Sequence, residues 1–556
     1  MSFEVSSSPV PKSLKIDYLL LLAMWAIVTA YNIFKPYHID DTAHLEIARW
    51  IMAHPLHPMS GLLNWDGSEE PIFKTNQPHL YFYILALWGY LFGFSEPAMH
   101  ALQAIPTLAC VLLFHRLARL YANPVAIWLT ALLMLGPAFV VEQNLMIDVP
   151  LLAVWLVFFS ALIGDIDSDD QTKRYLIASI ACSAAILIKY SSLVLMAILV
   201  ISLLFERRHR QAWTVLIPLV VLGLWSAFNY VDYGAVHIVN RPVDIARTPL
   251  MPLQLMMAWV LALGALTPLG IVAVAIHFPR QANIIYSATS MIFVALVVLV
   301  ASGTIPEEPA NVLLMIGFFA NSVAIWLGVG GRALRWIRQA SRLHFDRGAA
   351  PMLYLLLWIF GTSLFYVLFA PFVAARHVLL IIPALLLLCG LAWDDLWDAR
   401  AKVFAVSSTV ILSICLCCSD WRFAAFYKSE AEDLARSLPS ANKVWTSGHW
   451  GWQWYAQQAG FQQVDVESSK LAPGDLLIVA EDVDRQPLTM PVSLELIRSD
   501  TERYPLLRLF CTGKTARFYA SSMTEAPWSL SRDCVGHINV FRVIATGPLE
   551  SETTPP

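Results

Sequence analysis

Long apolar segments recur along this 556-residue chain, and they constrain its fold more than any other feature. A helix needs roughly 20 mostly apolar residues to cross the hydrocarbon core of a membrane. Segments of this kind recur from residue 16 to residue 418 and predict about 13 transmembrane helices by the same length rule. The predicted spans are residues 16–34, 98–118, 123–141, 148–164, 175–188, 191–205, 213–230, 252–276, 283–302, 311–330, 351–371, 378–392 and 403–418.

The composition supports a polytopic membrane protein. Charged residues make up 14% of the chain, against about 25% in a soluble domain. The mean hydropathy is +0.60, too apolar for a disordered, fibrous or cytosolic protein. The net charge of −4 offers no basic face to nucleic acid. The eight cysteines are not spaced as zinc or haem ligands.

Lysine and arginine gather in alternate loops, which predicts the orientation of the spans. The predicted inner loops carry Arg116, Arg119, Lys173, Arg174, Arg207, Arg208, Arg210, Arg332, Arg335, Arg338, Arg342, Arg347, Arg400 and Lys402. The outer loops carry only Lys189, Arg241, Arg247 and Arg376. With the N-terminus inside, as a retained signal anchor, the loop 35–97 and everything after residue 418 lie on the outer face.

The first outer loop contains two predicted helices. Residues 41–53 place apolar side chains at helical spacing opposite polar ones, which indicates an amphipathic helix on the membrane interface. Residues 78–94 are apolar and rich in aromatic side chains. They could form a span or a second interfacial helix. We favour the interfacial helix, because a span here would reverse every later loop against the charge rule.

The chain after the last span has a different character and predicts a second domain. Residues 1–418 form the predicted transmembrane domain, 419–546 a small α/β extracytoplasmic domain and 547–556 a disordered tail. Residues 431–439 read as a helix. The sequences DLLIVA, RLFCT, RFYA and INVFRV read as strands.

Acidic residues at the outer ends of spans are the first candidates for chemistry, because ionisable groups in apolar surroundings are costly. Asp40 and Asp41 open the predicted helix 41–53. They could be catalytic, could bind a divalent cation, or could cap the helix. Asp148 begins a later span on the same face, where an N-cap is again the alternative, and Glu142 precedes it on the same loop.

Basic residues on the same face could bind an anion. Lys189 lies in a hairpin between two spans, where snorkelling to the interface is the alternative role. Arg376 and His377 lie just before a span. An arginine there opposes the inner bias of positive charge, so it needs a local partner: a lipid phosphate, a carboxylate or a substrate phosphate.

Carboxylates and cations on one membrane face suit group transfer from a membrane-anchored phosphate. Such a reaction needs a base for the acceptor hydroxyl or amine. It also needs a cation or metal beside the departing phosphate. A phosphate leaves readily, so a second carboxylic acid, as in glycoside hydrolysis, is not required.

Five short motifs in order resemble the GT-C glycosyltransferases. They are DDTAHLEIARW, NQPHLYFYILALWGYLFG, the Asp-x-Pro at 148–150, LIKY and RHVLLIIP. Over roughly residues 15–400 the chain resembles bacterial polyprenyl-phosphate-sugar transferases. This group includes lipid A aminoarabinose transferases, protein O-mannosyltransferases and dolichyl-phosphate-mannose-protein mannosyltransferase-like families. The span number and the C-terminal outer domain also resemble the aminoarabinose transferases.

The resemblance implies roles for individual residues. Asp40 would be the base or the acceptor-orienting carboxylate, and Asp41 falls where relatives often carry Glu. Asp148 would match a second functional Asp, and Lys189 a recurrent Lys.

Arg376 would match the Arg of an Arg-Tyr pair in which His377 replaces Tyr. The chain departs from the family at 76–79, where relatives often carry His or Lys before Pro. Lys74 or His79 could supply the missing contact to the donor phosphate. A divalent cation held by Asp40 and Asp148 stays open.

Two features of the C-terminal domain allow alternatives. The segment around His449 contains four tryptophans that could stack on sugars, dip into the membrane interface or form the domain core; they are Trp445, Trp450, Trp452 and Trp454. Cys511 and Cys534 could form a disulfide in an oxidising compartment. Cys415, Cys417 and Cys418 read as packing residues at the end of the last span.

The sequence therefore predicts a multi-pass glycosyltransferase of a bacterial inner membrane. By the resemblance it would pass a sugar from a polyprenyl-phosphate carrier to a lipid, glycan or protein acceptor on the outer face. Membrane lipids would be further partners, and nucleic acid would not. The alternatives are a transporter or lipid flippase, a lipid-linked oligosaccharide ligase or polymerase, and a glycan-binding scaffold. A transporter would place its charges near the midplane, often within inverted repeats.

Overall fold

A computed structural model describes residues 12–546 with several gaps. The gaps are residues 66, 75–76, 165–169, 241–247, 343–349, 393–397, 439–442, 489–490, 503–507, 510–517, 521–524 and 533–535. The predicted disordered tail, Cys511 and Cys534 lie outside the described residues.

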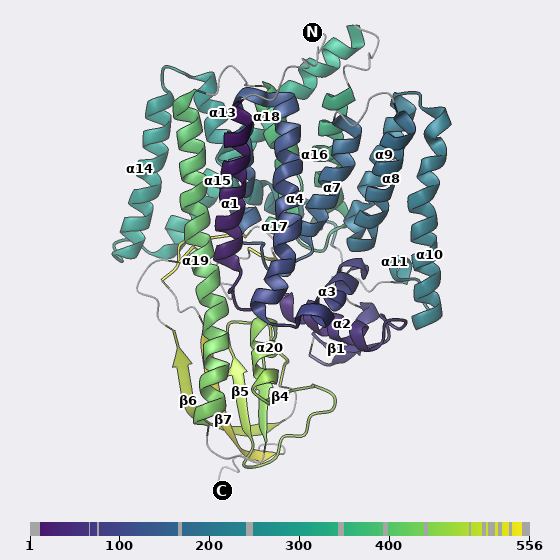
Figure 1. The fold of residues 1–556 in the computed structure, drawn as a ribbon. Helices are drawn as coiled ribbons and strands as arrows, with labels where there is room; N and C mark the ends of the chain where they lie inside the picture. The colour runs from purple at the N-terminus through teal and green to yellow at the C-terminus, as the bar shows by residue number, and fades with distance from the viewer. Residues whose placement is uncertain are drawn as a thin grey trace.

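The apolar segments form helices that run side by side in one bundle (Figure 1). A helix satisfies its own backbone hydrogen bonds, which lipid cannot do. The first half contains α1 (Lys12–Asn32), α4 (Glu96–Ala122), η2 (Asn123–Val125), α5 (Ala126–Met134), α6 (Pro137–Val140), α7 (Asp148–Ile163), α8 (Gln171–Ile188), η3 (Tyr190–Ser192), α9 (Leu193–Phe205), η4 (His209–Val215), α10 (Leu216–Tyr233) and α11 (His237–Asn240). The second half contains α12 (Met251–Leu266), α13 (Leu269–His277), α14 (Ala282–Ala301), α15 (Glu307–Arg342), α16 (Ala350–Phe369), α17 (Ala375–Leu379), α18 (Ile382–Ala392) and α19 (Ala399–Ser437).

Fewer helices can cross a membrane than the sequence predicts. By length and composition, six described helices qualify, or seven if the bent pair α12 and α13 forms one span. The difference from about 13 arises because several apolar runs are interrupted. The predicted span 123–141, for example, divides into η2, α5 and α6 at Pro124, Gly136 and Pro137. Proline cannot continue a helix without losing a hydrogen bond.

The first outer loop folds at the end of the bundle where α1 finishes. It contains α2 (Asp41–Ala53), β1 (Leu62–Asn64), β2 (Glu69–Pro71), η1 (Ile72–Lys74) and α3 (Leu80–Phe92). The prediction of a helix over residues 41–53 is confirmed. Helix α3 has 13 residues, about 20 Å in length, which is shorter than the roughly 30 Å of a hydrocarbon core. It packs against α2 at the bundle end (Figure 1).

The C-terminal part forms a mixed sheet beyond the same end of the bundle (Figure 1). It contains β3 (Val444–Ser447), α20 (Trp450–Gln458), β4 (Gln462–Gln463), β5 (Leu476–Ala480), β6 (Val492–Thr501) and β7 (His537–Thr546). The strand order is β4-β3-β5-β7-β6, with the first three strands parallel and the last two antiparallel to their neighbours. The predicted strands DLLIVA and INVFRV are confirmed as β5 and β7.

One local prediction in this part is confirmed and another needs correction. The helix predicted over residues 431–439 is present over 431–437, as the end of α19, which runs without a break from the last predicted span to Ser437. Its apolar face simply passes from the bundle to the sheet. The described residues 518–520 of RFYA are not a strand. Instead the Ala375 amide donates to the Phe518 carbonyl, so this segment packs on the bundle end. Most of RLFCT lies outside the described residues.

The first outer loop packs directly against the C-terminal domain. The Tyr37 amide donates to the Tyr455 hydroxyl over 2.8 Å, and Asn64 Nδ2 donates to the Val464 carbonyl over 3.1 Å. A Cβ atom on Gly451 would lie 2.2 Å from the Tyr37 carbonyl oxygen, so only glycine allows this approach of α20. The prediction that both regions lie at the same end of the bundle is confirmed.

Candidate active site

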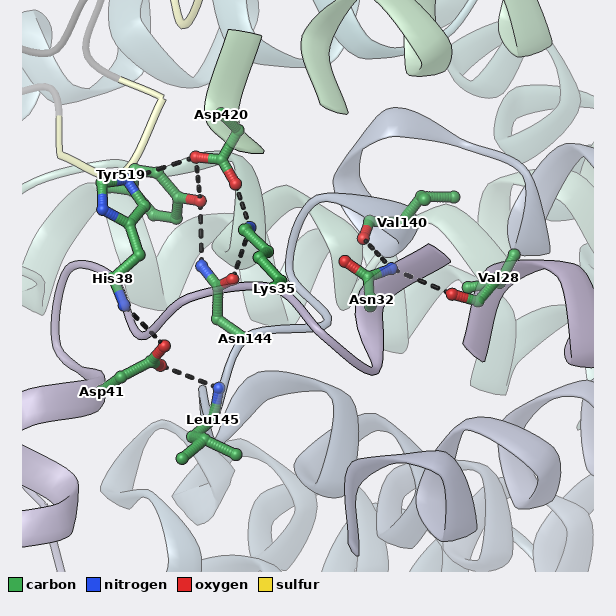
Figure 2. A network of polar contacts seen from close by, with 10 residues as sticks. All are labelled: Val28, Asn32, Lys35, His38, Asp41, Val140, Asn144, Leu145, Asp420 and Tyr519. Atoms are coloured by element: carbon green, nitrogen blue, oxygen red, sulfur yellow. Dashed lines mark hydrogen bonds and ion pairs between the residues drawn. The ribbon is translucent and has the colours of Figure 1, made fainter. Parts of the chain in front are cut away.

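Asp41 ties the first outer loop to the loop before α7. Its Oδ2 accepts from the His38 amide over 2.9 Å, and its Oδ1 accepts from the Leu145 amide over 2.8 Å (Figure 2). Burial raises the pKa of Asp41 to about 7. With both oxygens engaged by backbone, Asp41 holds two loops in register rather than facing a substrate.

Asp40, the residue before Asp41, has different contacts. It occupies the N-cap position of α2 but makes no hydrogen bond to the helix backbone, so the capping alternative is wrong. Ile39, just before it, has a φ of 48°, a strained value for a β-branched residue. The Asp40 carboxylate lies beside Arg376 instead of capping α2.

An ion-pair chain links Asp40 to three other predicted site residues. Asp40 Oδ2 lies 3.4 Å from Arg376 Nη2. Arg376 Nε lies 3.6 Å from Asp148 Oδ2, whose other oxygen accepts from Lys189 Nζ over 2.8 Å. Four segments far apart in sequence thus meet at one end of the bundle. The two carboxylates and two cations cancel in formal charge.

Burial distinguishes the members of this chain. The Asp148 side chain is 1% exposed, and those of Lys189 and Arg376 are 8% and 9% exposed. The Asp40 side chain is 30% exposed, which makes it the accessible end. Nη1 of Arg376 is buried without a hydrogen-bond partner among the described residues. A buried unpaired donor of this kind is costly, so it indicates a missing acceptor.

Local structure holds the two cations in place. Lys189 follows the last turn of α8 in an extended conformation, with φ −155° and ψ 128°, and so leaves the helix before η3 begins. Arg376 lies on the short helix α17. His377, beside it, is buried and stacks on Tyr366, with ring centroids 4.3 Å apart. Its Nδ1 accepts from the Ala374 amide. His377 therefore shapes α17 rather than facing the ion pairs.

Glu142 lies near the cluster without joining it. Neither carboxylate oxygen has a hydrogen-bond partner among the described residues, and both are buried. Burial raises the pKa of Glu142 to about 8, against the opposing field of Arg376. Glu142 is therefore mostly protonated at neutral pH and could donate a hydrogen bond from a carboxylic acid.

A second polar network, which the sequence analysis missed, lies beside Asp41 (Figure 2). Lys35 forms a buried ion pair with Asp420 and donates to Asn144 Oδ1 over 2.5 Å. The Tyr519 hydroxyl donates to Asp420 Oδ1 over 2.8 Å and accepts from Asn144 Nδ2 over 3.0 Å. His38 Nε2 lies 3.3 Å from Asp420. The sequence feature that could have indicated this network is the charge of Lys35 and of Asp420 at the outer ends of the first and last predicted spans.

Two predicted phosphate ligands do not join the ion-pair chain around Arg376. Lys74 pairs with Glu70 over 2.7 Å and is 42% exposed. His79 is buried and packs against Phe82 and Trp225. Both ring nitrogens of His79 lack a hydrogen-bond partner among the described residues. In the described part of the chain, no three His, Cys, Asp or Glu side chains are grouped to hold a metal ion, and the Arg376 guanidinium already bridges Asp40 and Asp148.

Comparison with solved structures gives distant similarities. ArnT from Cupriavidus metallidurans bound to undecaprenyl phosphate has 14% identity and a TM-score of 0.42, over 85% of this chain and 94% of that one. The oligosaccharyltransferase AglB of Archaeoglobus fulgidus has 13% identity and a TM-score of 0.45, over 85% and 70%. The arabinofuranosyltransferase AftD from Mycobacteria has 14% and 0.45, over 98% and 41%. TM-scores below 0.5 are too low to support a conclusion about function.

Comparison of the sequence with protein families is more direct. No curated protein matches the chain significantly. Residues 76–230 match the family model described as dolichyl-phosphate-mannose-protein mannosyltransferase. The matched segment contains Asp148 and Lys189, and it ends before Arg376. This match confirms the resemblance that the sequence indicates, and with it the enzyme class, a membrane glycosyltransferase that uses a lipid-phosphate sugar donor.

Proposed function

We propose that this protein transfers a sugar from a polyprenyl-phosphate carrier to an acceptor on the outer face of a bacterial inner membrane. The observation that carries the proposal is the Arg376 guanidinium, which bridges Asp40 and Asp148 and keeps one buried nitrogen without a hydrogen-bond partner in the part of the chain that the structure describes. The acceptor is a lipid, a glycan or a protein with a reactive hydroxyl or amine.

The donor phosphate binds at the cationic part of the site. Arginine presents several N–H donors in a fixed fork that matches phosphate oxygens. Nη1 of Arg376 is the donor still available to such an oxygen. Lys189, which pairs with the other oxygen of Asp148, adds a second positive charge. Asp148 lies between the two cations and keeps both in position before the donor arrives.

The acceptor is activated at Asp40. Its carboxylate is the most exposed group of the chain and lies on the far side of Arg376 from Lys189. In a single displacement, the acceptor oxygen or nitrogen forms a bond to the anomeric carbon while the bond from that carbon to the phosphate oxygen breaks. The acceptor proton passes to Asp40. Polyprenyl phosphate leaves with the electron pair, and its charge is stabilised by Arg376 and Lys189.

The position of the site supports an outer-face reaction. The ion-pair chain lies at the bundle end that also carries the first outer loop and the C-terminal domain, opposite the arginine-rich loops. We include in the proposal a transmembrane catalytic domain of residues 1–418 and an extracytoplasmic domain of residues 419–546. A carrier lipid reaches such a site laterally from the membrane.

Mass spectrometry of the cell envelope tests the proposal. Lipids and glycans from cells without the protein are compared with those from cells carrying the wild type, Asp40→Asn or Asp433→Asn. Asp433 is the matched control, because it pairs with Arg498 over 2.7 Å at the surface. We expect a mass difference of one sugar with the wild type and the control, and its loss with Asp40→Asn.

Three other results would contradict the proposal. Full sugar addition by Asp40→Asn would remove Asp40 from the reaction. Movement of the carrier lipid across vesicles by the purified protein, without consumption of the sugar, would favour a flippase. A product extended by many sugars would favour the polymerase alternative.

A further inference from the structure

A cavity lies between the first outer loop and the C-terminal domain, apart from the ion-pair chain. Its volume is about 270 Å³, and it is open on one side. This is close to the lower limit of roughly 300 Å³ for small-molecule sites. It is lined by Trp65, His449, Trp450, Asp484 and Arg485. The loop and the domain therefore build the cavity together.

The walls and rim of the cavity have different chemistry. Trp65 and Trp450 are half-buried, so each keeps part of its indole surface accessible, whereas Asp484 and Arg485 are exposed at the rim. The ring centroids of Trp65 and His449 are 5.5 Å apart. An apolar aromatic face beside charged hydrogen-bonding groups suits a ligand with both C–H faces and hydroxyls, as a pyranose ring has.

His449 offers the cavity a hydrogen-bond acceptor. Gln453 Nε2 donates to Glu46 Oε1 over 3.0 Å and to the Asn64 carbonyl over 3.2 Å, so Gln453 Oε1 is the acceptor of that amide. This oxygen lies 2.9 Å from His449 Nδ1, which is therefore the protonated nitrogen. The Gln486 amide nitrogen lies farther from Nδ1, at 3.3 Å.

The remaining nitrogen, Nε2, is buried without a partner among the described residues. The His449 residue is 2% exposed. Burial also lowers the pKa of His449 to about 4, so the ring is neutral at physiological pH. A neutral imidazole with a protonated Nδ1 accepts a hydrogen bond at Nε2, as from a sugar hydroxyl.

Backbone strain marks the same place. Trp450 has a φ of 59°, a rare value for a bulky residue. Strain of this kind persists where the surrounding structure over-determines it, and it clusters at ligand sites. Thr42, two residues after Asp40, donates to the Trp450 carbonyl over 2.5 Å. The cavity is thus joined to the helix that begins at the proposed base.

We propose that this cavity binds a sugar unit of a glycan acceptor and so presents the acceptor to Asp40, an inference that rests on the proposed function. The acceptor is favoured over the donor because the donor phosphate belongs beside Arg376 at the bundle end. The cavity is instead lined by residues of the first outer loop and of the C-terminal domain, whose helix α20 lies beyond the end of the bundle (Figure 1). Trp65 and Trp450 supply the stacking faces, and His449 and the rim residues bind hydroxyls.

Saturation-transfer NMR with the full-length protein in nanodiscs free of glycolipid tests the inference. The probes are the methyl glycosides of glucose, galactose, mannose and glucosamine. We expect at least one probe to receive saturation from the wild type, with about tenfold weaker affinity for Trp65→Ala, the usual cost of losing a central tryptophan. Trp213→Ala is the matched control, because Trp213 is 49% exposed on η4, at the other end of the bundle.

Substitution of His449 separates binding from folding. His449→Phe keeps an aromatic ring but removes the acceptor, and we expect it to weaken binding like Trp65→Ala. His449→Gln places an amide oxygen near the position of Nε2 and should restore binding in part. Failure of all four probes to bind the wild type, or equal binding by the wild type, Trp65→Ala and His449→Phe, would overturn the inference.

Comparison with the envelope assay keeps the two proposals apart. If probes bind through Trp65 but no sugar is ever added in cells, the cavity stands and the proposed function fails. If sugar is added normally by Trp65→Ala and His449→Phe, the acceptor role of the cavity fails while the proposed function stands. Binding of the purified variants to a polyprenyl-phosphate sugar should match the wild type, because the donor site lies beside Arg376.

Discussion

Lys35, just after the first span, and Asp420, in the last long helix, form a buried ion pair across 385 residues of sequence. Both side chains are almost fully buried, at 2% and 0% exposure. Asp420 also accepts from Tyr519. The pair therefore joins the beginning of the first outer loop, the last long helix and the segment around Tyr519.

Removing one partner of this pair should destabilise the protein strongly. Lys35→Met leaves the Asp420 carboxylate buried without its cation, which costs about 3–5 kcal/mol in the free energy of unfolding. The double variant Lys35→Met/Asp420→Leu should recover most of that loss, because no isolated charge remains. Thermal unfolding in nanodiscs measures both. Lys470→Met, at an exposed position, should change little, and a stable Lys35→Met protein would contradict the structural role.

Arg376→Lys should weaken the reaction although it preserves the charge. A lysine ammonium cannot bridge Asp40 and Asp148 and also reach a phosphate, because it lacks the planar fork. We expect turnover to fall about 10²–10³-fold, as for loss of one preorganised donor. Donor affinity and transfer rate with a synthetic polyprenyl-phosphate sugar measure the effect. Arg422→Lys is the matched control, because Arg422 pairs with Glu502 at a half-exposed site. Equal losses in both variants would argue against a special role for Arg376.

The stability of the protein should depend on pH through Glu142. Its pKa is raised to about 8 in the folded state, against about 4.3 in an unfolded chain. The protonated form is therefore favoured by folding, and this stabilisation is complete below pH 4.3 and lost as the pH rises through 8. We expect the free energy of unfolding to fall by up to about 1.4 kcal/mol for each pH unit in this window.

Glu142→Gln removes the titrating group and should flatten that dependence. Melting temperatures between pH 5.5 and 8.5 compare the variant with the wild type. Asp41 and Glu46, whose pKa values are both raised to about 7, add similar slopes below pH 7 in both proteins, so the two proteins should differ most clearly between pH 7 and 8. Glu308→Gln, at an exposed position, should leave the slope unchanged. A Glu142→Gln protein with the full wild-type slope would show that Glu142 does not titrate in this range.

The sequence predicted the members of the ion-pair chain because each lies where an apolar segment meets a polar loop on one membrane face. Charge placement therefore identified Asp40, Asp148, Lys189 and Arg376 without any contact being known. The ion pair between Lys35 and Asp420 was not predicted, because its two residues are distant in sequence and each resembles an ordinary charge at the end of a helix. Fewer described helices qualify as spans by length and composition than the sequence predicted, because four of the predicted spans are apolar helices of only 10–17 residues. The cavity at Trp65 could not be predicted, because it forms between two regions of the chain and the sequence pattern does not show that they pack together.

Tyr519→Phe tests whether the C-terminal segment supports the site. The hydroxyl donates to Asp420 and accepts from Asn144, and Asn144 precedes Leu145, whose amide binds Asp41. Loss of the hydroxyl leaves both partners under-satisfied in a buried place, so we expect about 1–3 kcal/mol of destabilisation. The transfer rate should fall, because the disturbance passes through Asn144 and Leu145 to the turn at Asp41. Tyr83→Phe is the matched control, since its hydroxyl donates to the exposed Pro55 carbonyl. If both variants melt and react like the wild type, the network around Asp420 does not support the first outer loop.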